Sequence, residues 1–389
     1  MSEIKLGLER TLAVLEVLGN PHERLKFVHI AGTNGKGSTA AMVANILKKA
    51  GYKVGLYTSP YVSCVTESMS INDVNITKTR LDAMVGGLLE YINSQTDKPT
   101  EFEIMTPLAF QYFLEEKCDI VVLEVGLGGR LDATNVIGSP EVAVITPIGL
   151  DHMEFLGGTV ESIAGEKAGI IKTGTVCVCH AQVPSVLDVI RKKCAQNDVE
   201  LRVVTEPETE LKVSLIGAHQ RFNAAVAIQV VNVLRQRAWN IPPDAVTDGL
   251  ATVKWAGRFE ILSESPLFAL DGAHNAHSVQ SVVDTLVSLY KDKRITFIYG
   301  VLADKDYKAM TEILLPVAEN FITITPDSPR ALPASKLADY INSRSKPAVA
   351  YDTIKKGVAK ALHATDSSSI ICALGSLYIF QGIRDALKH

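Results

Sequence analysis

Short apolar runs alternate with longer stretches of helical composition along the first two thirds of the chain. The apolar runs that predict strands are 27–30, 53–57, 120–125, 142–146, 175–178 and 201–204. The stretches between them that predict helices are 40–50, 78–94, 107–117, 185–196 and 220–236. Strands that alternate with helices usually pair in parallel through crossover connections. The order therefore predicts an α/β protein with a mainly parallel sheet.

The same alternation starts again after Arg258-Phe259-Glu260. The elements predicted there are strands at 267–270, 295–299, 321–325 and 370–374, helices at 278–289, 307–317 and 335–342, and a C-terminal helix. The chain of 389 residues also exceeds the size at which one hydrophobic core usually stops growing. We therefore predict two domains, residues 1–262 and a smaller α/β unit at 263–389, with the boundary near Ser263.

The composition excludes several classes of protein. An apolar fraction of 47% and a charged fraction of 21% are those of an ordinary globular protein. The net charge of -4 gives no general attraction to nucleic acid or to an anionic membrane, so neither is an expected partner. No stretch approaches the roughly 20 uninterrupted apolar residues of a membrane span. The start Met1-Ser2-Glu3-Ile4-Lys5 lacks the apolar core of a signal peptide, which predicts a cytoplasmic location.

Six cysteines are scattered through the chain, which in a reducing cytosol predicts free thiols. Cys177 and Cys179 are two positions apart in an alternating run, so both side chains point to one face of a strand. A metal site there needs further ligands that the sequence does not supply. We interpret both as buried small apolar residues.

The strongest local signal is a glycine-rich segment between a predicted strand and a predicted helix, Gly32-Thr33-Asn34-Gly35-Lys36-Gly37-Ser38-Thr39. Glycines let backbone N–H groups converge on a phosphate, and a helix N-terminus adds favourable partial charge. Lys36 can reach the outer phosphates, and Ser38 or Thr39 can meet a magnesium ion. The general phosphate-loop motif places Ser or Thr directly after the lysine, whereas here Gly37 intervenes. A simple glycine-rich turn is the alternative, which the strand–loop–helix context disfavours.

Two further side chains follow predicted strands. Glu124 ends an apolar run, and the carboxyl ends of parallel strands are where such sheets bind ligands. A carboxylate there is a suitable hard oxygen ligand for Mg²⁺. His152 follows the run around Ile145 and can complete a metal site, although a lone histidine is as often structural.

The variant loop is the one that Mur-type ligases carry, and the rest of the chain resembles the folylpolyglutamate synthase and dihydrofolate synthase family. The motifs that carry the resemblance cover nearly the whole chain: 123–135 (LEVGLGGRLDATN), 148–152 (IGLDH), 166–170 (EKAGI), 219–225 (HQRFNAA), 257–259 (GRF), 271–275 (DGAHN), 304–306 (DKD), 330–333 (RALP) and 375–378 (GSLY). The resemblance implies an N-terminal phosphate-loop ATPase domain of the Mur-ligase type and a smaller, Rossmann-like C-terminal glutamate-ligase domain.

The resemblance also implies an activity and its reactants. A ligase of this family joins L-glutamate to the carboxylate of a pteroate or folate at the expense of ATP, through an acyl phosphate. Mg²⁺ is the implied cofactor, and a monovalent cation is compatible with it. In the family, the lysine that matches Lys167 is carbamylated by CO₂, whereas a lysine in such a helix is ordinarily a solvated surface residue. We expect a monomer.

The resemblance assigns site residues one by one. The catalytic residues it implies are Lys36, Lys167 and His152. The implied ATP-binding residues are Thr33, Asn34, Gly35, Lys36, Gly37, Ser38, Thr39, Asn223, Arg258, Asp271 and His274. The implied metal ligands are Ser38, Ser59, Glu124 and His152. Folate binding falls to Phe102, Thr106, Asp132 and Ala133, within or near the matching stretches 100–106 and 123–135. Glutamate binding falls to Lys305 and Ser376 through the wider Mur-type resemblance, and an ordinary surface lysine is nearly as good an interpretation of Lys305.

One segment departs from the family pattern. Where the family has Ser-Pro-His-Leu followed by a Phe and a Glu-Arg pair, this chain has Ser59-Pro60-Tyr61-Val62, then Val65 and Glu67-Ser68. That loop lies near the acyl substrate in the family, so a sibling ligase for a non-folate carboxylate stays an alternative. A phosphate-loop NTPase that acts as a switch or motor, and a nucleotide-binding regulator without catalysis, are further alternatives. The sequence does not separate addition of the first glutamate from extension of a glutamate chain.

Overall fold

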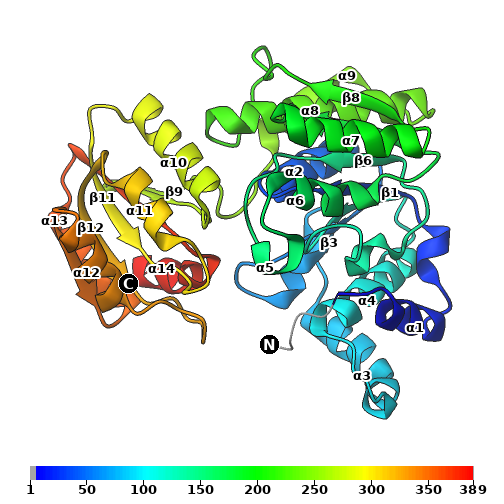
Figure 1. Ribbon diagram of the computed structural model, residues 1–389, viewed down its shortest axis with the longest axis horizontal. Helices are drawn as coiled ribbons and strands as arrows, with labels where there is room; N and C mark the ends of the chain where they lie inside the picture. The colour runs from blue at the N-terminus through cyan, green and yellow to red at the C-terminus, as the bar shows by residue number, and fades with distance from the viewer. Residues whose placement is uncertain (1–5, 389) are drawn as a thin grey trace. The chain divides into compact units, whose positions relative to one another are not determined.

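The computed structural model describes residues 6–388, which divide into two compact units (Figure 1). The first unit comprises the chain up to Ser214 together with Gln220–Lys254, and the second comprises Leu215–His219 together with the chain from Trp255. The N-terminal segment Met1–Lys5, on which the prediction about a signal peptide depends, lies outside the described residues. No helix within residues 6–388 combines the length and the apolar character that crossing a membrane requires.

Within residues 6–388, the first unit contains one sheet of eight strands in the order β4-β3-β2-β5-β1-β6-β7-β8. Their bounds are β1 Phe27–Ala31, β2 Val54–Tyr57, β3 Met69–Ile71, β4 Val74–Asn75, β5 Ile120–Glu124, β6 Val142–Ile145, β7 Val176–His180 and β8 Glu200–Val204. β1 lies at the centre and pairs in parallel with β5 on one side and β6 on the other. Only β3 and β4 are antiparallel to their neighbours.

Helices cover this sheet and close two apolar clusters. Their bounds are α1 Glu9–Val17, α2 Lys36–Lys49, α3 Lys78–Ser94, α4 Glu101–Glu115, α5 Met153–Leu156, α6 Val160–Lys167, α7 Pro184–Gln196, α8 Ala218–Gln236 and α9 Pro243–Thr252, with short 3-10 helices at η1 Pro21–Arg24, η2 Val65–Ser68, η3 Ala133–Val136 and η4 Ala168–Ile170. One cluster contains Phe27 of β1 together with Phe110 and Phe113 of α4, all buried. The other contains Ile145 and Cys177, which pack below α6 and α7.

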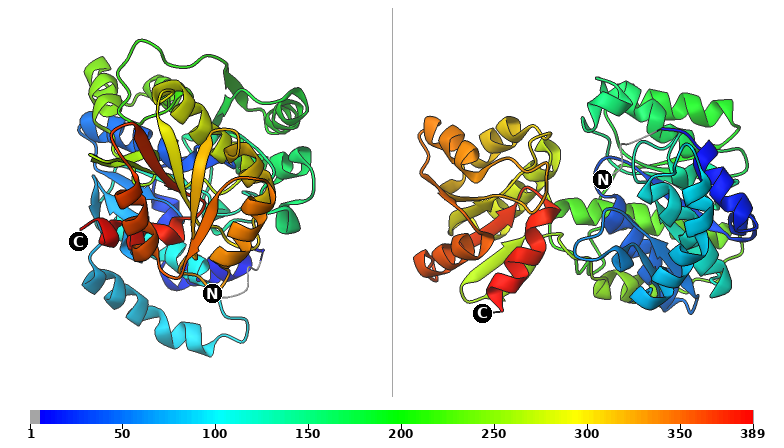
Figure 2. Two further views of the ribbon diagram at one scale, coloured as in Figure 1. Left: turned by 90° about the vertical axis from the view of Figure 1, so that its left-hand side faces the viewer. Right: turned by 90° about the horizontal axis from the view of Figure 1, so that it is seen from below.

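The second unit is built around a six-stranded sheet, within the described residues, in the order β13-β12-β11-β14-β10-β9. The strands are β9 Glu260–Glu264, β10 Leu267–Leu270, β11 Arg294–Tyr299, β12 Ala318–Ile324, β13 Ala348–Tyr351 and β14 Ser369–Leu374. The helices are α10 Ala276–Leu289, α11 Tyr307–Leu314, α12 Ala334–Ser343, α13 Ile354–Ala364 and α14 Phe380–Leu387, with a 3-10 helix at η5 Leu377–Ile379. All pairs are parallel except β9 with β10, and helices lie on both sides of the strands (Figure 2). The predicted α/β class with two largely parallel sheets is confirmed.

Two predicted helices begin earlier than the sequence prediction placed them. The sequence prediction started a helix at Pro107, but α4 begins at Glu101 and contains Pro107 in its interior. Thr100 caps the helix by accepting from the backbone N–H of Glu103, whose side chain accepts from the N–H of Thr100. This reciprocal pair fixes the start of the helix at Glu101, and the helix accommodates the proline in its interior. The helix at 40–50 likewise starts earlier, at Lys36.

The structure divides the chain a little earlier than the predicted boundary at 262/263. That boundary falls inside β9, which pairs with β10 and so belongs to the second sheet. The compact second unit accordingly includes residues from Trp255 and the short segment Leu215–His219. The six cysteines, all within the described residues, are free, and Cys177 and Cys179 are fully buried as interpreted from the sequence.

Candidate functional site

The carboxyl ends of four neighbouring parallel strands meet at one edge of the first sheet. β2, β5, β1 and β6 lie side by side in that order. The segments that leave them carry Ser59 after β2, Glu124 at the end of β5, the glycine-rich loop after β1, and His152 after β6. A parallel sheet places such segments around one crevice. The order of strands therefore brings together segments that are up to about a hundred residues apart in sequence.

The glycine-rich loop needs its glycines for close approach and for backbone conformation. Gly32 has φ 152° and Gly35 has φ 84°. A Cβ on Gly32 would lie 1.8 Å from Thr146 Oγ1, and one on Gly35 would lie 2.7 Å from Asn223 Oδ1. The N–H groups of Thr33 and Asn34 donate to Pro147 O at 2.8 and 3.2 Å, which anchors the loop to the segment after β6. α2 begins directly after Gly35, so its N-terminal N–H groups are available to an anion.

Lys36 lies at the start of α2 with Glu124 close by. Its Nζ is 3.9 Å from Glu124 Oε1 and donates to Thr33 O at 3.3 Å. Both side chains are largely buried, with 17% and 7% of their surface exposed. The predicted phosphate-directed cation and the predicted metal-binding carboxylate are therefore neighbours.

The hydroxyl groups of Ser38 and Thr39 are buried and have no hydrogen-bond partner within residues 6–388. A buried hydroxyl without a partner is uncommon and calls for an explanation such as a ligand or an ion. The sequence predicts that one of these two residues, Ser38 or Thr39 at the N-terminus of α2, meets the magnesium ion, and the family resemblance implies Ser38. Ser38 Oγ fits that purpose, because a hydroxyl oxygen is a hard ligand that Mg²⁺ accepts.

Lys167 is a buried residue, which corrects the general expectation of a solvated lysine in this helix. Only 5% of the residue is exposed, and Nζ donates to Gly32 O at 2.8 Å. Burial and the nearby charge of Lys36 lower the pKa of Lys167 to about 7, against the opposing effect of Asp151. The amine is thus neutral in a substantial fraction of molecules near neutral pH.

The helix end that carries Lys167 approaches the loop after β5 very closely. A Cβ on Gly129 would lie 2.8 Å from Glu166 O and 2.9 Å from Lys167 O. The Arg130 guanidinium also pairs with Glu166 at 2.9 Å. Glycine at 129 therefore permits the contact that brings Lys167 to the glycine-rich loop.

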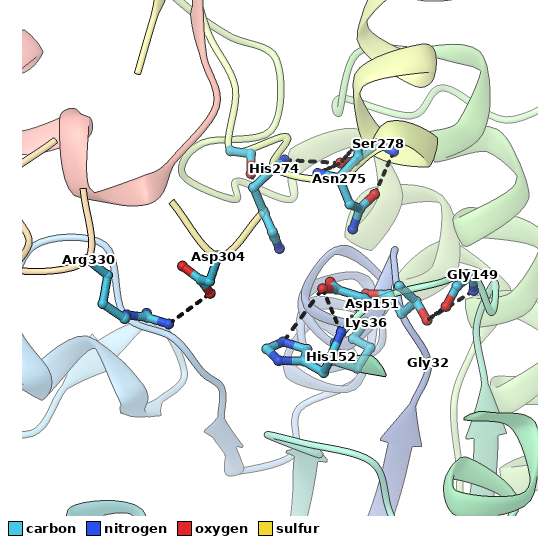
Figure 3. A network of polar contacts seen from close by, with 12 residues as sticks. Gly32, Lys36, Gly149, Asp151, His152, His274, Asn275, Ser278, Asp304 and Arg330 are labelled. Atoms are coloured by element: carbon cyan, nitrogen blue, oxygen red, sulfur yellow. Dashed lines mark hydrogen bonds and ion pairs between the residues drawn. The ribbon is translucent and has the colours of Figure 1, made fainter. Parts of the chain in front are cut away.

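His152 is the most exposed of the predicted metal ligands in the first unit. It has φ 51° at the start of α5, and 39% of its side chain is exposed. Its Nε2 lies 3.9 Å from Asp151 Oδ1 (Figure 3). Sequence reasoning assigned no role to Asp151, although an acidic residue directly before the histidine was a usable signal.

No group of three or more His, Cys, Asp or Glu side chains within residues 6–388 is arranged to hold a metal ion. Ser59, the remaining predicted ligand, is half-buried in the segment after β2. Mg²⁺ in nucleotide sites usually keeps several waters and takes one or two carboxylates together with substrate phosphates. The residues present fit that kind of shared site and not a dedicated protein cage.

The predicted folate residues line the loop after β5 and the start of α4. The Phe102 ring lies over Gly126, where a Cβ would come within 2.7 Å of Phe102 Cζ. It is half-buried and lies 5.9 Å from the Tyr57 ring, whose hydroxyl bonds to Thr106 Oγ1 at 3.1 Å. Asp132 and Ala133 are 5% exposed. The predicted residues therefore divide into a partly exposed ring and buried groups that support it.

In the second unit, Asp271 and Arg258 lie together at the carboxyl end of β10. Asp271 accepts from the backbone N–H of Phe259 and of Ala273, both at 2.7 Å. Burial raises the pKa of Asp271, and the charge of Arg258 acts in the opposite direction. Asp271 thus fixes the backbone beside Arg258. It is 5% exposed, which leaves little of it open to the ribose hydroxyls that the sequence suggested as partners.

His274 precedes α10, which begins with a capping box formed by Asn275 and Ser278. Its Nδ1 bonds to Gly272 O at 2.8 Å, and its backbone N–H donates to Ser278 Oγ at 3.1 Å (Figure 3). The ring is therefore held in one orientation.

The predicted glutamate-binding residues follow the carboxyl ends of the adjacent strands β11 and β14. Lys305 is half-buried, whereas Ser376 is 3% exposed and its Oγ accepts from Tyr378 N at 3.3 Å. Asp304, which directly precedes Lys305 in the chain, forms an ion pair with Arg330 at 3.2 Å (Figure 3).

Two polar residues near these sites escaped sequence reasoning. Gln182 donates to Thr146 O and accepts from Ile148 N, so it fixes the segment that anchors the glycine-rich loop. Gln182 lies 34 residues or more from these partners in the chain, so no local pattern points to it. His219 is near Arg258 in the second unit, and burial and that positive charge lower its pKa to about 4. It lies in a motif that sequence reasoning used only for the resemblance.

Comparison with known proteins identifies the family to which the two units are similar. Residues 30–197 match the Mur ligase middle domain, and residues 257–377 match the Mur ligase, glutamate ligase domain. The chain is 38% identical to the dihydrofolate synthase/folylpolyglutamate synthase of Bacillus subtilis over 99% of this chain and 96% of that protein. It is 35% identical to the folylpolyglutamate synthase of Lacticaseibacillus casei over 97% of this chain and 94% of that protein.

Solved structures agree with the sequence relatives. Escherichia coli FolC in complex with DHPP and ADP superposes with a TM-score of 0.89 at 29% identity, over 100% of this chain and 95% of that chain. The Mycobacterium tuberculosis folylpolyglutamate synthase complexed with ADP and AMPPCP also has a TM-score of 0.89 at 29% identity, over 98% of this chain and 94% of that chain.

Proposed function

Because this chain belongs to the folylpolyglutamate synthase and dihydrofolate synthase family of Mur ligases, we propose that it joins L-glutamate to the carboxylate of a pteroate or folate at the expense of ATP. It is an ATP-dependent ligase. The proposal assigns phosphoryl transfer to the first unit and recognition of glutamate to the second.

The phosphates of ATP bind at the loop Gly32–Thr39. Its backbone N–H groups and the N-terminus of α2 favour an anion, and Lys36 supplies a mobile cation 3.9 Å from Glu124. When nucleotide binds, Lys36 turns from Glu124 toward the outer phosphates and offsets the charge of the transferring group. Asn223, which touches Gly35, holds the loop in its binding shape.

Ser38 and Glu124 are the residues that would hold Mg²⁺, with Ser59 and His152 as further ligands. The unpartnered Ser38 hydroxyl and the carboxylate beside Lys36 match the hard oxygen donors that this ion prefers. When bound, Mg²⁺ offsets negative charge on the phosphates. A monovalent cation is compatible with the same site, so activity is to be measured with and without K⁺.

Lys167 is carbamylated in the active enzyme. As an ammonium it would be a buried charge and would also lie next to the cation Lys36, and these two effects, burial first, lower its pKa to about 7. The reaction of the neutral amine with CO₂ forms an N–C bond and releases one proton, which converts the group into an anion. That anion would attract Lys36 and a divalent ion, where the ammonium would repel both.

The acyl substrate lies against Phe102 and the loop 126–132, and glutamate binds in the second unit. Lys305 suits one glutamate carboxylate, and the segment at Ser376 offers a hydroxyl and backbone N–H groups. Arg258, held by the network of Asp271, and His274 contact ATP. The protein acts as a monomer in the cytoplasm.

The reaction proceeds in two balanced steps. A carboxylate oxygen of the pteroate or folate attacks the γ-phosphorus, the bond to the β-phosphate oxygen breaks, and ADP leaves. The glutamate amine then attacks the acyl carbon, phosphate leaves with the oxygen that attacked, and the amine proton passes to solvent or phosphate. Exclusion of water protects the acyl phosphate from hydrolysis.

The buried, unpartnered hydroxyl of Ser38 in a strand–loop–helix with Lys36 beside Glu124 is the observation that carries the proposal. The test is a screen of carboxylates with ATP and glutamate, read by phosphate release and product mass. We expect phosphate release that depends on both glutamate and a pteroate or folate, with a product heavier by one glutamyl residue. ATP turnover without glutamate would instead support an NTPase switch.

A non-folate carboxylate is the second candidate substrate, and the segment after Ser59 favours it. Glu67 Oε2 accepts from the N–H groups of Val62 and Ser63 at 2.9 and 3.0 Å, so the altered segment has a defined shape. Tyr61 is 43% exposed at the start of this segment. If this segment selects another acid, the screen will show glutamate ligation with that acid and none with pteroate or folate.

Glu124→Gln and His152→Ala should each raise the Mg²⁺ concentration needed for half-maximal activity, because each removes a proposed ligand. We expect a shift of roughly ten-fold or more for each, and a ten-fold shift corresponds to ~1.4 kcal/mol. The measurement is a Mg²⁺ titration at saturating ATP. Glu116→Gln and His363→Ala, in exposed positions away from the sheet edge, are the matched controls. Parental midpoints in both site variants would remove these residues from the metal site.

A further inference from the structure

A chain of buried hydrogen bonds joins the strand that leads into the phosphate loop to the loop after β5. His29 lies on β1, three residues before Gly32, and its Nε2 is 2.9 Å from Thr134 Oγ1. The Thr134 hydroxyl is 2.5 Å from Asp132 Oδ1, and Asp132 Oδ2 accepts from the backbone N–H of Leu127 at 2.7 Å. The sequence assigned no role to His29 or Thr134.

The direction of each hydrogen bond follows from the protons available. Asp132 accepts backbone N–H groups from Leu127 and Thr134, which favours the carboxylate although burial raises its pKa. A carboxylate only accepts, so the single hydroxyl proton of Thr134 goes to Asp132. The Thr134 oxygen must then accept from His29, which places the ring proton of His29 on Nε2.

Packing alone explains His29 poorly. Burial lowers its pKa to about 3, so the ring is neutral at physiological pH. Its Nδ1 is then a buried acceptor without a hydrogen-bond partner among the described residues. Such an acceptor costs about 1–3 kcal/mol, which an apolar side chain of similar shape would avoid. The hydrogen bond that Nε2–H donates to Thr134 Oγ1 offsets part of that cost, and an apolar side chain could not make it.

We propose that His29 is a positioning residue for the acyl substrate, because it orients the Thr134 hydroxyl that holds Asp132 and with it the loop 126–132. Gly126, at the start of this loop, lies under the Phe102 ring, and Gly129 lies against the backbone of Lys167. A change in the loop therefore alters the surface at Phe102 that we propose the acyl substrate contacts. This inference rests on the proposed function of the loop in binding the acyl substrate.

Thr134→Val, which keeps the shape and removes the hydroxyl, tests the inference. We expect KM for dihydropteroate or folate to rise roughly ten-fold, about the effect of losing one hydrogen bond, with KM for ATP unchanged. Thr134→Ser restores the hydroxyl and should restore the parental KM. Thr11→Val is the matched control, because Thr11 is buried in the same unit with a hydroxyl that has no partner. An equal rise in both KM values, or no rescue by serine, would overturn the inference.

The tautomer of His29 can be measured on the unaltered protein, so this second test does not depend on whether a variant folds. ¹⁵N NMR of the histidine-labelled, unaltered protein should show His29 neutral with its proton on Nε2. A proton on Nδ1, or a cationic ring at neutral pH, would contradict the proposed hydrogen-bond direction. Failure of the proposed function has a different signature, since the unaltered protein would then release no glutamate-dependent phosphate with either substrate.

Discussion

Replacement of Lys36 by alanine should slow ligation by a few hundred-fold while leaving the fold largely intact. Lys36 is the cation at the start of α2, and its partner in the absence of nucleotide is Glu124 at 3.9 Å. A contact of this kind strengthens as charge develops on the transferring phosphoryl group, and its loss typically costs about 3–4 kcal/mol of transition-state stabilisation. The rate is to be measured at saturating ATP, so that weaker nucleotide binding does not mask the loss in kcat.

Two further variants separate charge from packing. Lys36→Met keeps most of the side-chain volume and removes the charge, so it should lose as much activity as Lys36→Ala. Lys48→Ala removes a more exposed lysine near the other end of α2, where it pairs with Asp73, and should leave the rate unchanged. Parental turnover in both Lys36 variants at saturating ATP would contradict the assignment of the phosphate loop.

Lys167→Ala should lose roughly two orders of magnitude in activity, because it removes both the group that we propose to be carbamylated and the donor to Gly32 O. Lys167→Arg should fail as badly, since arginine stays cationic and is not carbamylated in the same way. Short carboxylic acids should restore part of the activity of Lys167→Ala by placing a carboxylate in the vacated space. Lys172→Arg is the control for the change in side-chain size. Lys172 is a half-buried lysine that donates to Asn135 O.

The same proposal predicts a dependence on pH and CO₂. Carbamylation needs the neutral amine, and the lowered pKa of about 7 means that the neutral fraction grows as pH rises through that value. Enzyme depleted of CO₂ at low pH should therefore regain activity with bicarbonate more completely at pH 8 than at pH 6. A bare lysine by mass spectrometry or crystallography, together with full activity in Lys167→Arg, would contradict the carbamate.

Much of the fold followed from periodicity and composition. α3 and β10 have the predicted bounds, because each is a continuous run of helical or apolar character with clear ends. α4 was placed six residues late, because the proline was given more weight than the Thr100–Glu103 cap. β13 was not predicted at all, because its four residues, Ala348–Tyr351, are apolar but form too short a run to identify a strand by periodicity.

The candidate site was less accessible from sequence. The phosphate loop is local, so its spacing and its strand–helix context were visible. The burial of Lys167 is not local, since it depends on the close approach of Gly129 to the end of α6. The link from His29 to Thr134 joins residues 105 positions apart. Sequence reasoning had no means to pair them without a known order of strands.

The measurement that tests the central claim most directly follows oxygen from the acyl substrate into phosphate. The protein is given ATP, glutamate and a pteroate or folate whose carboxylate carries ¹⁸O, and the released phosphate is analysed by mass. An acyl-phosphate ligase transfers one labelled oxygen to each phosphate, with release that requires glutamate and yields one amide per phosphate. Unlabelled phosphate, or phosphate released equally well without glutamate, would contradict the claim that this chain is an acyl-phosphate-forming glutamate ligase.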